Sequence, residues 1–244
     1  MKKKNEYMVK IGALVVFAIA MGLLEAVVVV YLRTLVYPDG FRFPLKMLSE
    51  KIYTVEVARE AATLVMLAGV GAAAGRKYYD RLAYFLLTFA VWDIFYYAFL
   101  KVYLDWPATL MDWDILFLIP TTWISPVLAP VLCSLAMILM AALILYFDRQ
   151  GRLICFNKLE WAGIYGGALV IFLTFIRDYA SLILSSDLPQ NHFVLRDSTI
   201  FQSMTAGFVP QAYAWGWFAA GLGMILLALA SWTCRTRQQS AATD

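Results

Sequence analysis

Charged residues are scarce in this 244-residue chain, at 15% of all positions, whereas apolar residues make up 62%. Ordinary soluble domains carry about 25% charged residues and roughly 45–50% apolar ones. A soluble domain of this length has too much surface to cover with so few charges, and a disordered chain would need low hydrophobicity and a high net charge. The composition excludes both classes and indicates an integral membrane protein.

Histidine and cysteine are almost absent, which removes several kinds of chemistry. The single histidine, His192, lies in a polar stretch, and we expect it to be a solvated loop residue. Bis-histidine haem ligation, Glu-x-x-His di-iron centres and histidine-rich desaturase sites all need more imidazoles. Cys133, Cys155 and Cys234 form no C-x-x-C pair and indicate neither a disulfide framework nor a zinc site. We therefore expect no metal site and no cofactor, and the sequence identifies no catalytic residue.

Nucleotide- and nucleic-acid-binding signatures are also missing. The chain has no G-x-x-x-x-G-K-[ST] sequence, so nucleotide-driven transport is not expected. Its net charge is +3, and the basic residues stand in short patches rather than in one stripe. This pattern suits lipid headgroups and topology signals and predicts no nucleic-acid partner. The expected partners are membrane lipids, with a homo-oligomer or a larger membrane complex as further options.

Six apolar runs are long enough to cross the hydrocarbon core of a bilayer, which takes about 20 residues. We predict spans at residues 11–32, 53–75, 82–104, 127–147, 161–184 and 212–232. The predicted fold class is all-α, a polytopic transmembrane helical bundle, with residues 1–244 as a single integral membrane domain. Lysines precede the first run, as in a signal peptide, but the run is too long and lacks a small-residue cleavage site. We therefore expect a retained anchor.

Prolines interrupt the apolar stretch that precedes the fourth run. Pro120, Pro126 and Pro130 each remove a backbone donor and disfavour helix in the residue before them. We therefore expect residues 109–126 to form a segment that is broken at its prolines. The segment either lies at the membrane interface or re-enters the membrane, where broken helix is tolerated if it lines a cavity or is covered by protein.

Basic residues predict the orientation of the bundle. If the N-terminus is cytoplasmic, twelve lysines and arginines lie on the cytoplasmic side and five on the opposite side. Because the Lys and Arg bias sets orientation, we expect both termini in the cytoplasm. The first outer loop fits imperfectly, since it carries four of the five opposing residues, Arg33, Arg42, Lys46 and Lys51.

Eight charged residues fall inside the predicted spans, where a charge at the helix centre costs at least about 2.5–3.5 kcal/mol. They are Glu25, Glu56, Arg59, Glu60, Asp93, Lys101, Arg177 and Asp178. None lies deep in the cytoplasmic half, so one polar cavity that opens outward would explain all of them. Tyr97 lies on the same helix face as Asp93 and Lys101 and completes the set of binding or coupling candidates.

The signs of these eight charges do not balance, because five carboxylates stand against three cations. Full pairing would leave two carboxylates without a basic partner, and such a group takes up a proton or holds a cation. We expect Glu25 and Asp93 to be these two, since neither has a basic residue within one turn of its own helix. The alternative is structural: interhelical ion pairs, of Arg59 or Arg177 with Asp93 or Glu25, would only fix the packing.

Several short stretches carry a resemblance to a group of prokaryotic multi-span membrane proteins. The stretches are WDIFYY (92–97), LDWP (104–107), WDILFLIPTTWISPVLAPV (113–131), GLLEA (22–26) and EVAREAAT (56–63). The chain resembles that group in its WDxFYY and WDxLFLIPxxWxxPVxAPV motifs over roughly residues 20–135. The resemblance implies a prokaryotic cytoplasmic (inner) membrane. It implies no activity and assigns no residue a role.

Three classes of function fit these observations. A small-solute transporter linked to protons or cations ranks first, because the excess carboxylates and the proline-broken segment support it. An accessory subunit of a larger membrane complex ranks second, because the small-residue pairs Gly71/Gly75 and Ala219/Gly223 are either internal packing or an interface. A membrane enzyme for a lipid-like substrate ranks third, since only carboxylates are present as a general base.

Overall fold

The computed structural model describes residues 2–38, 40–44, 46, 48–184, 208–210 and 212–241, and His192 lies outside these ranges. Long helices account for most of the described residues. They are α1 (Lys2–Val36), α2 (Glu50–Ala74), α3 (Tyr78–Leu104), α4 (Leu128–Arg149), α5 (Lys158–Leu184) and α8 (Trp215–Ala241). Each contains an apolar stretch long enough to cross a membrane, which confirms the prediction of a helical, multi-pass membrane protein.

The helix ends differ from the predicted spans by a few residues in several places, and local polar residues account for some of them. The Ser49 side chain accepts a hydrogen bond of 3.4 Å from the Ile52 backbone N–H, so α2 begins at Glu50 rather than at residue 53. At the C-terminal end of α3, Asp105 adopts a left-handed conformation with φ of 51° and ends the helix. Hydropathy locates the apolar middle of each helix, and these short polar signals locate its ends.

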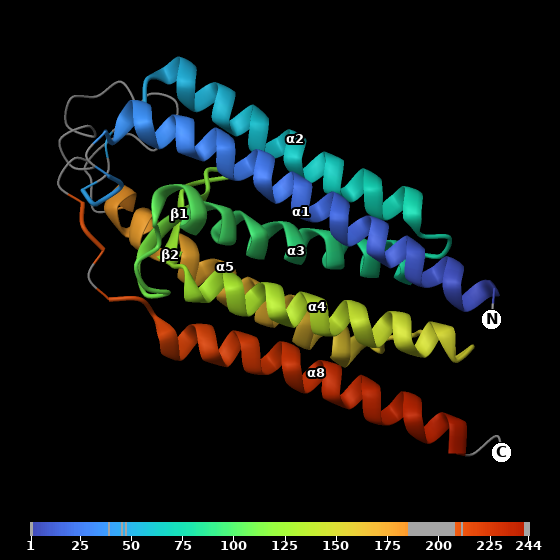
Figure 1. Ribbon diagram of the computed structural model, residues 1–244. Helices are drawn as coiled ribbons and strands as arrows, with labels where there is room; N and C mark the ends of the chain where they lie inside the picture. Colours follow the sequence, from blue (N-terminus) through green and yellow to red (C-terminus); the bar gives the residue numbers. More distant parts are fainter. Residues whose placement is uncertain are drawn as a thin grey trace.

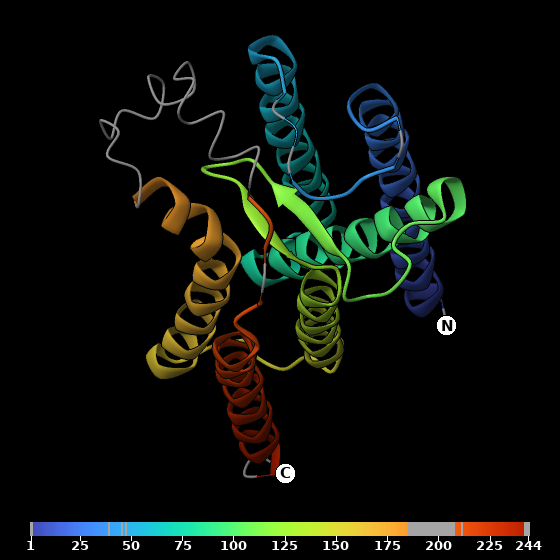
Figure 2. The same cartoon turned by 90° about the vertical axis from the view of Figure 1, so that its left-hand side faces the viewer.

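The six helices run along the long direction of the molecule, with both chain termini at the same end (Figure 1). In the view along this direction, α3 lies at the centre of the arrangement (Figure 2). It packs against α1, α2 and α4, while α5 packs against α8. Within the described part of the chain, α3 is the helix against which α2 packs closely. Contact between α2 and α1 is made instead by long side chains that bridge the two helices.

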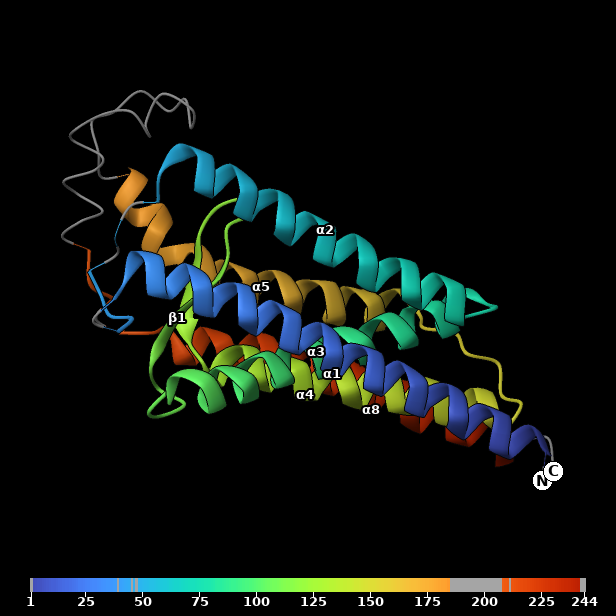
Figure 3. The ribbon, with the colours of Figure 1, turned by 45° about the horizontal axis from the view of Figure 1, so that its top comes forward.

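Residues 105–127, between α3 and α4, form a β-hairpin instead of a helix. Strand β1 (Trp113–Phe117) pairs antiparallel with β2 (Trp123–Pro126), and the register shifts between Ile115 and Phe117. The hairpin lies near the end of the bundle that is remote from the termini (Figure 3), and β2 packs against α4 and α5. Pro120 falls in its turn and Pro126 at the end of β2, where no ladder donor is needed. The sequence predicted a break here but not paired strands, so the all-α class holds for the spans and not for this segment.

Glycines set the closest helix contacts. A Cβ atom added at Gly71 of α2 would lie 2.8 Å from the Phe85 Cβ on α3, and one at Gly167 of α5 would lie 2.4 Å from the Gly221 carbonyl oxygen on α8. The Gly71/Gly75 pair is therefore internal packing. By contrast, Gly223 on α8 would have no described atom within 4 Å of an added Cβ.

Gly71→Ala should destabilise the fold, because the added methyl group collides with the backbone of α3. We expect a loss of about 1–3 kcal/mol, as for other overpacked sites. Gly69→Ala is the matched control on the same helix, since an added Cβ there meets nothing within 4 Å. It should be neutral or should stabilise by up to ~1 kcal/mol through helix propensity. Thermal unfolding in detergent, followed by tryptophan fluorescence, measures both variants, and equal Tm values would contradict the packing.

Candidate functional site

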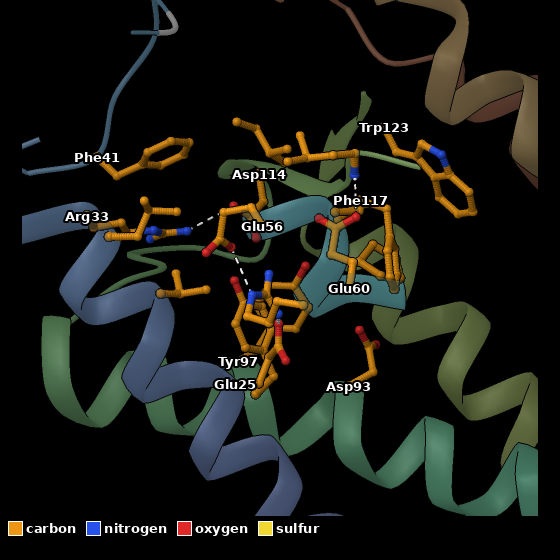
Figure 4. Close-up of a pocket in the computed structure, with 18 of the residues that line it drawn as sticks. Glu25, Arg33, Phe41, Glu56, Glu60, Asp93, Tyr97, Asp114, Phe117 and Trp123 are labelled. Carbon is orange, nitrogen blue, oxygen red and sulfur yellow. Dashed lines mark hydrogen bonds and ion pairs between the residues drawn. The ribbon is translucent and has the colours of Figure 1, made fainter. Parts of the chain in front are cut away.

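A cavity of about 280 Å³ lies in the half of the bundle that is remote from the termini. Its wall is formed by the second half of α1, the first half of α2, the middle of α3, the hairpin and the start of α4, and Figure 4 shows side chains from α1, α2, α3 and the hairpin around it. Six of the nine candidate residues from the sequence line it: Glu25, Glu56, Arg59, Glu60, Asp93 and Tyr97. Residues that are up to 72 positions apart in the chain therefore converge on one polar space.

Arg59 on α2 holds two carboxylates at one side of the cavity. Its Nε donates to Glu56 Oε2 at 2.8 Å, and its Nη1 forms an ion pair with Glu25 of α1. Thr63 Oγ1 adds a hydrogen bond of 3.3 Å to the second oxygen of Glu25. The expectation that Glu25 has no basic partner is therefore wrong, because its partner comes from α2 and not from its own helix. This cluster is also a direct link between α1 and α2.

Arg33 and Asp114 form a second, more deeply buried ion pair that the sequence analysis missed. Arg33 Nη2 lies 2.9 Å from Asp114 Oδ1, and the two side chains are only 8% and 2% exposed. The guanidinium lies over the Phe41 ring at 4.3 Å and over the Trp106 ring at 3.8 Å. Burial raises the pKa of Asp114, and the neighbouring Arg33 guanidinium opposes that rise.

The sequence assigned both members of this pair to the outer loops. Arg33 lies only one residue past the predicted first span, and Asp114 lies in the proline-broken segment. The available signal was the position of Arg33 directly after an unbroken apolar run. Without knowledge of the hairpin, nothing could place Asp114 beside it.

Of the five described carboxylates that line the cavity, Asp93 and Glu60 form no ion pair with a described residue. Asp93 accepts a hydrogen bond of 2.8 Å from the Ser134 hydroxyl on α4, and Glu60 accepts one of 2.9 Å from the Leu118 backbone N–H. Among the residues that the structure describes, no lysine or arginine lies within ion-pair distance of either. The expectation for Asp93 thus agrees with the geometry, and Glu60 takes the place expected for Glu25.

An aromatic wall forms one side of the cavity and joins four elements. We use this name for Phe89, Trp92, Phe117, Trp123 and Phe175. Successive ring centroids lie 5.2, 6.3, 5.3 and 5.9 Å apart, from α3 through β1 and β2 to α5. Such edge and stacked contacts stabilise the packing of the hairpin against the helices. These five rings and Asp93 line the same cavity.

The other three candidates lie outside the cavity lining. Lys101 is two turns beyond Asp93 on α3 and pairs with the exposed Asp105 at 2.7 Å, which lowers the pKa of Asp105. Arg177 is exposed on α5, and Asp178 is half-buried there. Periodicity grouped Lys101 with Asp93, but it could not show that the cavity ends before the last turn of α3.

Cys133 and Ser134 complete the cavity wall where α4 faces Asp93. Within the described ranges, no three His, Cys, Asp or Glu side chains are grouped so that they could hold a metal ion. No protein-family model, curated protein or solved structure matches this chain.

Breaking the buried ion pair should be more damaging than removing it. Arg33→Met or Asp114→Leu alone leaves one buried charge without a partner, and we expect a loss of about 3–5 kcal/mol. The double variant Arg33→Met/Asp114→Leu should recover most of that loss. The exposed pair Lys101–Asp105 is the control, and Asp105→Asn should leave the Tm unchanged. Additive losses in the double variant, measured by unfolding in detergent, would show that the two residues do not pair.

Proposed function

We propose that this protein is a membrane carrier that moves a small solute and couples the movement to a proton or cation at Asp93. The observation that carries the proposal is the environment of Asp93. It lies midway along the spanning helix α3, has only the Ser134 hydroxyl as a described partner, and lines a cavity. Intramembrane carboxylates are expensive and mark ion and proton pathways. A carboxylate in this setting is neutral only when it holds a proton or a cation.

A barrier on the outer side of the cavity supports a carrier over an open channel. A second hollow of about 290 Å³ lies beyond the cavity, and Arg33, Tyr37 and Phe41 line both spaces. The Arg33–Asp114 pair, with the rings around it, therefore stands between them. A carrier must close its site on each side in turn. We assign this pair to the outer closure.

The proline-broken segment fits a re-entrant element in this proposal. The hairpin supplies Asp114 to the outer closure, and the Leu118 N–H binds Glu60. Non-helical backbone at membrane depth is tolerated where protein covers it or where it lines a cavity. The hairpin meets both conditions, because β2 packs against α4 and α5 and its residues line the cavity.

The proposed location is a prokaryotic cytoplasmic membrane, with both termini in the cytoplasm and the cavity nearer the outer face. The excess of lysine and arginine at the terminal end supports this orientation. It includes Arg76 and Lys77 between α2 and α3, Arg149 at the end of α4, and Arg152 between α4 and α5.

Thiol labelling tests the orientation with a native residue. Cys155 is exposed in the connection between α4 and α5, at the terminal end. In a Cys133→Ser/Cys234→Ser background, a membrane-impermeant maleimide should label Cys155 in inside-out vesicles and not in right-side-out vesicles. Ala108→Cys, exposed near the opposite end, is the control in a background that otherwise lacks cysteine and should give the reverse pattern. The opposite result for both sites would invert the topology.

Transport itself is tested in proteoliposomes that contain a pH-sensitive or a sodium-sensitive dye. Cationic, neutral and anionic small solutes are added in turn, and at least one class should change the internal signal. Asp93→Asn should reduce that response at least about tenfold, as expected for loss of the coupling group. Asp148→Asn removes a carboxylate at the terminal end, outside the cavity, and should respond like the unaltered protein. No response to any class, or a full response from Asp93→Asn, contradicts the proposal.

A further inference from the structure

The charges around the cavity are arranged against an anion and in favour of a cation. Both arginines in its wall are already engaged: Arg33 binds Asp114 between two rings, and Arg59 binds Glu25 and Glu56. The third basic residue of the lining, Lys46, is exposed and lies over the Tyr37 ring at 5.4 Å. An entering anion would therefore meet five carboxylates and no free guanidinium, with Lys46 as the one lining cation that no described carboxylate engages. An entering cation would meet Asp93, which has no cation of its own among the described residues.

The aromatic wall points to an organic cation rather than a metal ion. Calcium takes six to eight oxygen ligands and magnesium about six in strict geometry, whereas the described oxygen bonded to Asp93 is the single hydroxyl of Ser134. Trp92 precedes Asp93 in the chain, Phe89 lies one turn before it, and Phe117 contacts Trp92 at 6.3 Å. Ring faces within about 6 Å attract an ammonium group and also cover an apolar body.

The size of the cavity limits the solute. Its volume of about 280 Å³ lies at the lower end of ligand pockets, which run from about 300 to 1,000 Å³. A single-ring amine fills such a space, with the ammonium at Asp93 and the ring against the aromatic wall.

We infer that the cavity binds a small organic cation, an amine with an apolar or aromatic body, and that its ammonium group replaces a proton at Asp93. One carboxylate neutralises either a proton or an ammonium group. Binding of R–NH₃⁺ to the protonated acid therefore releases one H⁺ and forms the carboxylate–ammonium pair, so charge is conserved. The exchange step rests on the proposed carrier function, and the binding step stands without it. Transport would then be an electroneutral exchange of one amine for one proton.

Isothermal titration calorimetry on the full-length protein in detergent tests the binding step with three probes of similar size. They are 2-phenylethylamine, 2-phenylethanol and phenylacetate. The amine should bind at least about tenfold more tightly than the alcohol and the acid, because only it can pair with Asp93 and lie against the rings. Repeating the titration in buffers of different ionisation enthalpy should show about one proton released per amine bound.

Two variants separate the carboxylate from the rings. Asp93→Asn should weaken amine binding at least about tenfold and abolish proton release. Phe117→Leu keeps the apolar volume but removes a ring face, and it should weaken binding by roughly three- to tenfold with proton release intact. Asp148→Asn should bind as the unaltered protein does. Thermal unfolding without ligand confirms that each variant is folded, and Phe117→Leu provides a test if Asp93→Asn is not.

The outcomes distinguish this inference from the carrier proposal. Equal binding of the amine and the alcohol, tighter binding of phenylacetate, or unchanged amine binding by Asp93→Asn overturns the organic-cation assignment even if a solute drives proton flux. Selective amine binding with proton release but no flux in proteoliposomes supports the assignment and contradicts the carrier function.

Discussion

The cost of placing charge at membrane depth is the constraint on which the outer half of this bundle depends. Because the hydrocarbon core does not solvate a charge, each ionisable group there must pair with an opposite charge, be neutralised by gaining or losing a proton, or face water. Two arginines meet this need for three carboxylates. Arg33 pairs with Asp114 and Arg59 with Glu25, both on other elements, and Arg59 also pairs with Glu56 of its own helix. The carboxylates that these arginines do not reach face a cavity, and the functional proposal begins with them.

The same pairs explain how the helices around the cavity are held together. Helices α2 and α3 meet through Gly71, whereas α1 and α2 are joined at cavity level by the Arg59 cluster. The hairpin is held to α1 by Arg33 and to α2 by the Leu118–Glu60 hydrogen bond. Ion pairs and hydrogen bonds can exchange partners more readily than packed glycine contacts can. The polar contacts among α1, α2 and the hairpin are therefore suited to a cavity that opens and closes.

Hydropathy and length predicted the six apolar helices, because a span of about 20 apolar residues is a local property of the sequence. They also showed which charges lie within spans. Which helices are neighbours is a non-local property, so the sequence offered the pairing of Glu25 with Arg59 only as one of several alternatives, and the lack of a cation at Glu60 could not be predicted. The hairpin was missed for a related reason: two strands of five and four residues leave little periodicity, and prolines indicate only that a helix ends. Arg177 and Asp178 show the converse error, since depth along a helix does not say which way a side chain faces. Lys101 was placed on the face of Asp93, but the cavity ends before it.

The central claim is that Asp93, in the wall of a water-accessible cavity, binds either a proton or a cation, and Cys133 in the same wall is a native reporter of the negative charge on Asp93 at a pH high enough to remove its proton. In a Cys155→Ser/Cys234→Ser background, the rates of modification of Cys133 by 2-aminoethyl and 2-sulfonatoethyl methanethiosulfonate compare a cationic with an anionic reagent. The account predicts that Asp93→Asn lowers the cation-to-anion rate ratio at least about fivefold, whereas Asp148→Asn leaves it unchanged. A ratio that is the same in Asp93→Asn and in the background protein would contradict it.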